Sequence, residues 1–507
     1  MPFFDFHCHP GLKPQFSALD HAPSPWDNIT ATLEVPILKT LGINLLFNEV
    51  LNSQSSLTQL SKEVKMIGLV LHAPEQNMAK SLAERKIIRS SSISLLNLDR
   101  IEFIAEGTHY FTIIQQELQR LRSSTSQDGA SLKIISKRSD FDEQKTQTVF
   151  GIITVEGLHC FFSDPAAPDA KQQFEVNFET FTNQQKVFAA NLCHLQQNPF
   201  CNHAFGIQFF KNEYFYPVGN GITEWGREMI ERLKVKDILI DVKHMSLKSR
   251  RDFYDLMRDD NGKYAQPLIC THAGVTGLSI NDRVKFLAEK PKDVGAVYEV
   301  IWLKPRSKHL RNTYFNCSSI NLYDEDIEVI LRSGGLIGLS FDQRIIGFAN
   351  ENMLRSATFP HEAEFISKSE ARFFLGPSPS TLPSYSGNDA WKSEDFENLD
   401  PSLNEILHLE FFFNQAFHIL DVARLNGMSV KQASKQICLG TDFDGLINAI
   451  DNCKTATDLP SFKQTATSRL PQLLKEAKLD NEGLNVQEFV EDLFYRNGRN
   501  FVLSRLK

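Results

Sequence analysis

The feature that most constrains the fold of this chain is a series of short apolar runs that end in polar residues. Eight such runs occur, at residues 3–9, 64–72, 151–157, 187–194, 238–244, 267–272, 335–342 and 437–445. Most are followed by segments in which apolar residues recur at intervals of three and four, such as 223–235, 247–257 and 323–334. This alternation predicts βα units that build a parallel sheet.

Because these runs are apolar throughout, both faces of the sheet are expected to be buried. Eight units fit a closed α/β fold, the (β/α)8 TIM barrel, better than the alternative of an open doubly wound sheet. The length of 507 residues permits a single barrel domain over 1–507 with long βα-loop insertions. We place insertions near 98–148, 285–312 and 346–402, which fit no regular unit, and expect the last two to form lids or oligomer contacts.

Composition and charge exclude several classes of protein. Apolar residues make up 42% of the chain and charged residues 23%, as in a globular protein. The net charge of −8, without a dense basic run, argues against nucleic acid as a partner. No signal-like opening and no membrane-length apolar run occur, so we expect a cytoplasmic protein without membrane contact. Eight cysteines form no CxxC pair, which predicts reduced thiols.

Hard-to-bury residues fall at the carboxyl ends of the predicted strands: His7, His9, Glu156, His194, His244, His272 and Asp442. In a parallel barrel these ends converge on one mouth, so the pattern predicts a shared site. Side chains alternate along a strand, so His7 and His9 point the same way. Imidazole and carboxylate suit Zn²⁺ and similar metals, and the set is large enough for two ions about 3.5–4 Å apart. Asp442 is then the expected proton shuttle.

Each of these residues also has a simpler interpretation. An HxH pair alone is a weak metal signal, Glu156 could be a buried ion-pair partner, and two of the histidines could be ordinary core residues. The segment TDFDG at 441–445 could be a turn or a calcium-like loop. The shared placement at strand ends favours the metal site. His159, His203 and His418 lack that placement, and we predict structural or loop roles for them.

The motifs around these residues resemble those of the membrane (renal) dipeptidase family, within the metal-dependent amidohydrolase superfamily. The resemblance is carried by TVEGLH, LCHLQQNPF, IDVKHMS, CTHAG, NLYDEDIEVILRSGGLIGLSF, LGTDFDG and FYRNGRNFV. It covers the first ten residues and 150–283, 314–345 and 403–507. The three insertions match nothing in the family.

The resemblance implies a role for each matching position. It implies two divalent metal ions, with zinc as the expected metal, and Glu156 bridging both. The other implied metal ligands are His7, His9, His244 and His272. His194 contacts the substrate and polarises the scissile carbonyl, and Asp442 is the catalytic acid/base. Asn321 and Arg283 are the expected further substrate-binding residues, and the chain is expected to form a homodimer.

Three departures from the family fall near the chemistry. His9 stands where the dipeptidases carry an aspartate, which removes one negative charge from the first ion. Ile320 stands where the family has an arginine that clamps the terminal carboxylate of a dipeptide. Arg283, Arg311 or a lysine of 285–312 are candidates to replace it. The glutamate motif reads EGL where the family often has EGG.

Together these features predict a binuclear metal-dependent hydrolase, a metallopeptidase-like enzyme that cleaves an amide bond in a dipeptide or dipeptide-like small molecule. An amidohydrolase that acts on a lactone, a cyclic amide or an N-acyl substrate is the alternative. A metal-binding barrel without catalytic activity is the third hypothesis.

Overall fold

A computed structural model gives the structure of the protein. It describes residues 2–15, 24–30, 52–83, 97–107, 109–126, 128–206, 213–348, 361–376, 379, 382, 390 and 404–507.

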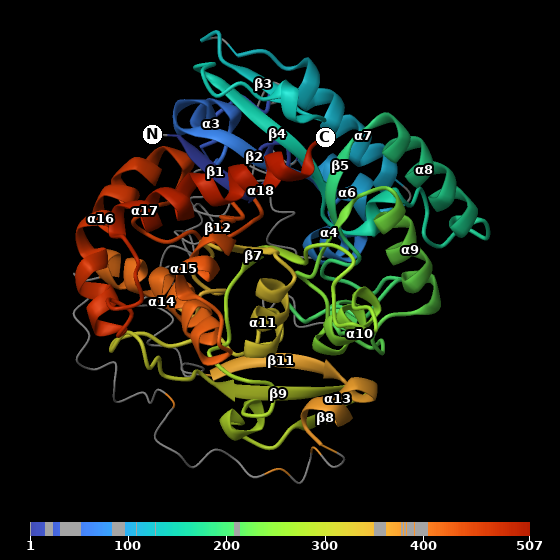
Figure 1. The fold of residues 1–507 in the computed structure, drawn as a ribbon. Coiled ribbons are helices and arrows are strands. Elements are labelled where there is room, and N and C mark those ends of the chain that lie inside the picture. Colours follow the sequence, from blue (N-terminus) through green and yellow to red (C-terminus); the bar gives the residue numbers. More distant parts are fainter. Residues whose placement is uncertain are drawn as a thin grey trace, which may run out of the picture.

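Eight parallel strands form a barrel: β1 (Phe3–Cys8), β2 (Val64–Leu71), β4 (Thr148–Val155), β5 (Val187–Asn191), β6 (Leu239–Asp241), β7 (Ile269–Ala273), β10 (Leu336–Leu339) and β12 (Ile437–Leu439). Each pairs with the next, and a parallel bridge from Cys8 to Phe443 joins the segment after β12 back to β1 (Figure 1). A short outer strand, β3 (Ser131–Ile134), extends β4. Every apolar run contains one barrel strand, so the predicted (β/α)8 barrel is confirmed.

Apolar side chains fill one end of the barrel. A single buried cluster draws residues from all eight strands, among them Phe4, Phe6, Phe150 and Phe188. A cluster shared by every strand lies inside the barrel. It also includes Val502 and neighbouring residues of α18 (Asn497–Arg505), so the last helix covers that end of the barrel (Figure 1).

The helices pack around the outside of the barrel. Those after α3 (Leu57–Glu63) include α4 (Gln76–Ala83), α6 (Leu98–Ala105), α7 (Tyr110–Ser123), α8 (Ala170–Gln184), α9 (Glu224–Val235), α10 (Leu247–Met257), α11 (Asp324–Arg332), α13 (Lys368–Phe374), α14 (Asn404–Leu425), α15 (Val430–Ala433), α16 (Leu459–Glu476) and α17 (Val486–Glu491). The three helices predicted from spacing are α9, α10 and α11. The side chains of Thr223 and Ser246 cap the first two, each accepting a backbone N–H three residues on.

The stretches predicted as insertions contain regular structure. Residues 98–148 include α6, α7 and β3. Parts of 285–312 and 346–402 form one antiparallel sheet of β8 (Lys292–Val294), β9 (Val297–Leu303) and β11 (His361–Ser367), at the bottom of Figure 1. Much of 346–402 lies outside the described residues.

This sheet is fastened to the barrel loops through the buried carboxylate of Glu364. This carboxylate accepts hydrogen bonds from the indole of Trp302 and the backbone N–H of Ser319, and it forms an ion pair with Arg283. The sheet is therefore held against the loops that follow β7.

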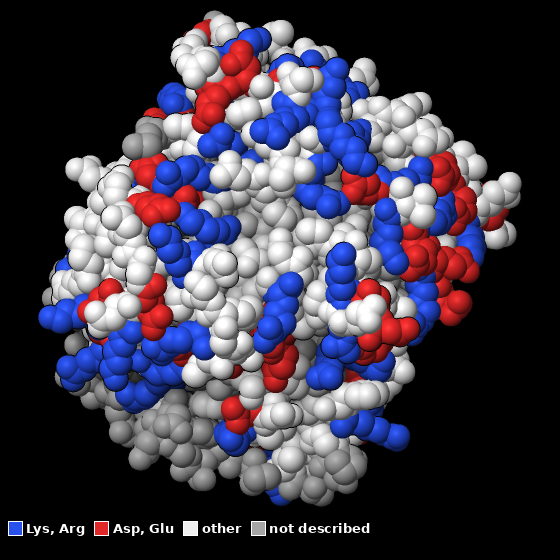
Figure 2. Space-filling view, viewed as in Figure 1, with Lys and Arg blue, Asp and Glu red and all other residues white. Residues whose placement is uncertain are grey.

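Basic and acidic side chains are interspersed over the face of the molecule in Figure 2. In the described part of the chain, no helix is both long and apolar enough to cross a membrane.

Candidate metal centre

The structure brings the seven predicted site residues together at the carboxyl end of the barrel. His7 lies in β1 and His272 in β7. The other five lie one to three residues beyond the end of a barrel strand; they are His9, Glu156, His194, His244 and Asp442. All five implied metal ligands are buried, and the least covered side chains of the seven are His194 and Asp442, with exposed fractions of 10% and 14%. The open side of the site therefore lies beside these two.

Four imidazoles converge on the carboxylate of Glu156. Its Oε1 lies 3.3 Å from His7 Nε2, 3.1 Å from His244 Nε2 and 3.6 Å from His272 Nε2. Its Oε2 lies 3.5 Å from His9 Nε2. Glu156 thus stands between two pairs of histidines. We call the residues His7, His9, Glu156, His244 and His272 the metal centre.

Within each pair the two Nε2 atoms also face each other. His7 and His9 are separated by 3.1 Å, and His244 and His272 by 3.2 Å. A tetrahedral ion with ligands at 2.0–2.2 Å has ligand–ligand edges of about 3.3–3.6 Å. The observed separations are within about 0.2 Å of the shortest of these edges. The donors are the imidazole and carboxylate groups that borderline divalent ions prefer. The residues present therefore fit two ions, one on each side of Glu156.

Two site residues hold a backbone conformation that is rare for residues other than glycine. His244 has φ of 70° and Asp442 has φ of 64°. Such left-handed conformations cost free energy and cluster at functional sites. The Asp442 backbone is fixed because its N–H donates to His7 O at 2.9 Å.

One hydroxyl orients two of the histidines. Thr271 Oγ1 lies 2.9 Å from His7 Nδ1 and 3.1 Å from His272 Nδ1, and it also bonds the buried carboxylate of Asp241. Because the hydroxyl donates its proton to Asp241, it can accept from the ring N–H groups, which leaves both Nε2 atoms as free lone pairs.

Burial and charge set the protonation of the centre. Burial lowers the pKa values of His9, His244 and His272 well below 6.5, so their rings are neutral. Burial would raise the pKa of Glu156, but the nearby histidines hold it well below its usual value. Burial raises the pKa of Asp442 to about 7, although His7 acts in the opposite direction. Asp442 Oδ1 lies 3.4 Å from His9 Nε2, at the edge of the centre.

His194 is held by a glutamate that the sequence analysis missed. Its Nδ1 donates to Glu75 Oε1 at 2.5 Å, and Glu75 also accepts the backbone N–H of Leu195. This bond turns His194 Nε2 towards Glu156 Oε2, 3.6 Å away. Glu75 follows β2 by four residues. The sequence feature that points to this loop is His72, which ends the apolar run at 64–72 as the other site histidines end their runs.

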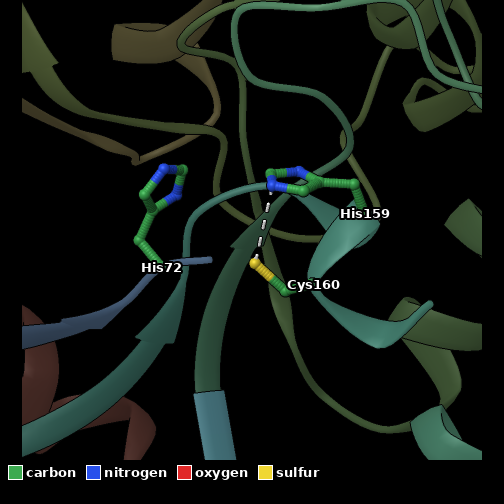
Figure 3. Close-up of side chains that lie close together, drawn as sticks. All are labelled: His72, His159 and Cys160. Carbon is green, nitrogen blue, oxygen red and sulfur yellow. Dashed lines mark hydrogen bonds between the residues drawn. The ribbon is translucent and has the colours of Figure 1, made fainter. Parts of the chain in front are cut away.

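A second group of possible ligands lies beside the metal centre: His72, His159 and Cys160 (Figure 3). His72 Nδ1 donates to Glu156 O at 3.0 Å, and His159 Nε2 donates to Ala73 O at 2.8 Å. Cys160 Sγ accepts from Ala73 N at 3.3 Å. Burial lowers the pKa of His159 to about 4 and raises that of Cys160 well above 9. We call this group the backbone-bonded cluster, because each of its members is already bonded to the main chain.

The other histidines set apart in the sequence also have protein partners. His203 Nε2 donates to Phe215 O at 3.1 Å, and His418 Nε2 lies 2.6 Å from Asp324 Oδ1. His418 Nδ1 also contacts His309 at 3.3 Å.

The two expected substrate-binding residues outside the strand ends are placed differently. Asn321 donates from Nδ2 to Asn316 O and Ile345 O, while its buried Oδ1 has no hydrogen-bond partner in the described chain. Arg283 is 1% exposed, and its guanidinium pairs with Glu364 and lies 4.3 Å from the centre of the Trp302 ring. Its charge is therefore already compensated by Glu364.

Neither a model of a known protein family nor a curated protein matches the chain. Solved structures do match. One is a dipeptidase described as a family M19 metallopeptidase, with 13% identity and a TM-score of 0.47 over 100% of this chain and 98% of its own.

Two further structures cover all of this chain. A metallopeptidase from Rhodobacter sphaeroides, liganded with a phosphinate mimic of the dipeptide L-Ala-D-Ala, has 13% identity, a TM-score of 0.47 and 99% of its own length covered. The probable dipeptidase PvdM from Pseudomonas aeruginosa has 14% identity, a TM-score of 0.45 and 96% covered. The chain is a (β/α)8 barrel with four buried histidines gathered around one glutamate.

Proposed function

We propose that this protein is a binuclear metal-dependent hydrolase that cleaves an amide bond in a dipeptide or dipeptide-like small molecule. The observation that carries the proposal is the convergence of four imidazole Nε2 atoms on the carboxylate of Glu156. Imidazole rings packed with their Nε2 atoms 3.1–3.2 Å apart, three of them with pKa values that burial lowers well below 6.5, are what a site for cations requires. Nothing in a purely structural core calls for that arrangement.

The ligands divide into two sets. His7 and His9 would hold the first ion with the Glu156 carboxylate, and His244 and His272 would hold the second with the same carboxylate. Asp442 borders the first set and could complete it. Zinc is the metal we expect, because imidazole and carboxylate ligands in this number are typical of catalytic zinc. When bound, two such ions supply Lewis-acid polarisation and lower the pKa of water to about 7.

His194 would stabilise the carbonyl oxygen of the substrate. It follows β5, and the carboxylate of Glu75 fixes its ring with Nε2 directed at the centre. An Nε2–H donor in that position can bond an oxygen that gains negative charge during the reaction. Glu75 is fully buried and ionised, because the adjoining His194 and His72 hold its pKa well below the usual value.

Asp442 would carry the proton. Its pKa of about 7 lets it accept a proton from water and pass it to the leaving amine near neutral pH. It is also the most exposed of the site residues, which places it on the side from which a substrate arrives.

The choice of an amide substrate is supported by the motifs shared with the dipeptidase family. We also propose the cytoplasm as the compartment and a homodimer as the assembly, both on the basis of the sequence.

The experiment is a substrate panel with the zinc-loaded protein. L,L- and L,D-dipeptides are compared with lactones, cyclic amides and N-acyl amino acids, with a chelator-treated sample as control. We expect dipeptide turnover that the chelator removes and zinc restores. Turnover of the other substrates alone would favour the second hypothesis. A protein that holds zinc but hydrolyses nothing in the panel would support the non-catalytic barrel.

A further inference from the structure

Lys243 is a buried cation next to the metal centre. It immediately precedes His244 in the turn after β6 and is 2% exposed. Its backbone is fixed on both sides, because its N–H donates to Asp241 Oδ1 at 3.0 Å and its carbonyl accepts from Asn191 Nδ2 at 3.2 Å. The backbone from which the side chain extends is therefore held in place by the barrel.

The ammonium of Lys243 makes one weak polar contact. Nζ donates to Ile320 O at 3.4 Å, and no carboxylate of the described chain lies within ion-pair distance of it. Two equally buried lysines differ in this respect. Lys13 Nζ lies 2.7 Å from Asp444, and Lys304 Nζ lies 3.1 Å from Glu362.

A buried ammonium without a paired anion is costly. An anion from outside the chain would compensate this charge.

The turn that faces Lys243 is held rigidly. Arg250 donates to Ser319 O at 2.7 Å and to Asn321 O at 3.2 Å, and Glu364 accepts the N–H of Ser319. A fixed turn beside a fixed cation is a preorganised binding position.

The neighbouring arginines do not contribute a second free cation. Arg250 pairs with Asp326 at 3.0 Å, Arg283 pairs with Glu364, and Arg344 pairs with Asp342 at 2.5 Å. One available ammonium suits an anion with a single charge, such as a carboxylate, better than a phosphate.

We propose that Lys243 binds a carboxylate of the substrate, beside the turn at 318–321, and so sets the preference of the site for substrates with a free carboxyl group. The inference rests on the proposed function and specifies its substrate class. Asn321 Oδ1, the partnerless acceptor in the same turn, would receive an N–H of the bound substrate rather than its carboxylate.

The test compares one dipeptide with its C-terminal carboxamide. The acid and the amide share the scissile bond and differ only in the charge that Lys243 would recognise. For zinc-loaded wild-type protein we expect kcat/KM to be higher for the acid. In Lys243→Met we expect the acid-to-amide ratio of kcat/KM to fall about 10- to 100-fold, mainly through KM for the acid. Lys243→Arg should keep part of the preference, because it keeps the charge.

Lys304→Met is the matched control, since Lys304 is also buried but already has Glu362. It should change kcat/KM equally for acid and amide. If Lys243→Met does not fold, as judged by circular dichroism, Lys243→Gln takes its place. A ratio that stays within about twofold of wild type in the folded variant overturns the inference. Absence of hydrolysis of both compounds by the wild-type protein would instead overturn the proposed function, so the two failures are distinguishable.

Discussion

Two buried groups of histidines lie side by side at the carboxyl ends of the strands, and they differ in what their ring nitrogens contact. In the metal centre, Nε2 atoms face other Nε2 atoms and the carboxylate of Glu156. In the backbone-bonded cluster, ring N–H groups of His72 and His159 donate to main-chain carbonyls. Both groups touch Glu156, one through its carboxylate and the other through its carbonyl oxygen.

The difference predicts that only the metal centre binds metal ions. In the backbone-bonded cluster, the ring nitrogen of His159 that faces Cys160 Sγ, Nε2 at 3.9 Å, is the one that donates to Ala73 O, and burial keeps the Cys160 thiol protonated by raising its pKa. In the metal centre, Thr271 accepts the Nδ1 protons of His7 and His272, which leaves the Nε2 lone pairs of these two rings directed at the centre. If this comparison is right, substitutions in the first group alter metal binding and catalysis, while those in the second alter only stability.

The largest effect is expected for Glu156→Gln. Its two oxygens contact all four histidines, so the neutral amide should release both ions. We expect metal content, measured by elemental analysis, to fall from two ions to below one and activity to fall at least about a thousandfold. Glu117→Gln is the matched control. Glu117 is an equally buried carboxyl group that lies outside the metal centre and accepts the backbone N–H of His72. Retention of two ions in Glu156→Gln would break the comparison.

A smaller loss is expected for Asp442→Asn, which removes the proton carrier. General acid–base catalysis contributes about 10²- to 10⁴-fold, and kcat should fall by that factor while the fold is unchanged by circular dichroism. Asp342→Asn should have a much smaller effect, because that carboxylate is engaged by Arg344. Equal losses in the two variants would contradict the role of Asp442.

Thr271→Val should weaken metal binding without removing a ligand. Loss of the hydroxyl frees the rings of His7 and His272 to rotate and to change tautomer. Such supporting contacts are worth about 10- to 100-fold in metal affinity, which competition with a chromogenic chelator measures. Thr154→Val makes the same chemical change in β4, where the buried hydroxyl has no hydrogen-bond partner in the described chain. The control should bind zinc like wild type, and an equal loss in both would remove the role of Thr271.

The smallest effect on chemistry is expected for His159→Gln, which keeps a donor for Ala73 O. Metal content should not change. The pKa of His159 is about 4 in the folded protein and 6.5 without burial, so only the unfolded chain binds the proton between these values. Stability from this residue is present above pH 6.5 and is lost as the pH falls towards 4.

The variant should therefore lose less stability than wild type between pH 7 and pH 4.5, by on the order of 2 kcal/mol. Urea unfolding at the two pH values measures this difference. Identical pH dependence of the two proteins would show that the pKa of His159 is not lowered in the folded protein. The backbone-bonded cluster would then again be a candidate cation site.

The barrel and the gathering of site residues could be predicted from the sequence because both follow from local patterns. An apolar run is a buried strand, and parallel strands bring their carboxyl ends to one edge. His72 belonged to the same pattern, since it ends the run at 64–72, but it was not included in the predicted site. Its position beside His159 and Cys160 shows that the pattern finds neighbours of a site as well as its ligands.

Contacts between distant segments could not be predicted in the same way. Glu75 lies in a loop and acts on His194, 119 residues later. Its sequence position makes Arg283 a candidate carboxylate ligand, but its partner Glu364 lies in the stretch 346–402, which fits no regular pattern. Lys243 lies within the motif IDVKHMS. That its ammonium contacts Ile320 O, and no carboxylate of the described chain, follows only from the tertiary structure. Such pairings depend on the tertiary fold and leave no periodic signal.

The most direct test is anomalous X-ray diffraction from crystals of the zinc-loaded protein, measured at the zinc absorption edge. The account predicts two peaks, one between Glu156 and the pair His7 and His9, the other between Glu156 and the pair His244 and His272. It predicts no peak among His72, His159 and Cys160. A peak in the backbone-bonded cluster, or none beside Glu156, would contradict it.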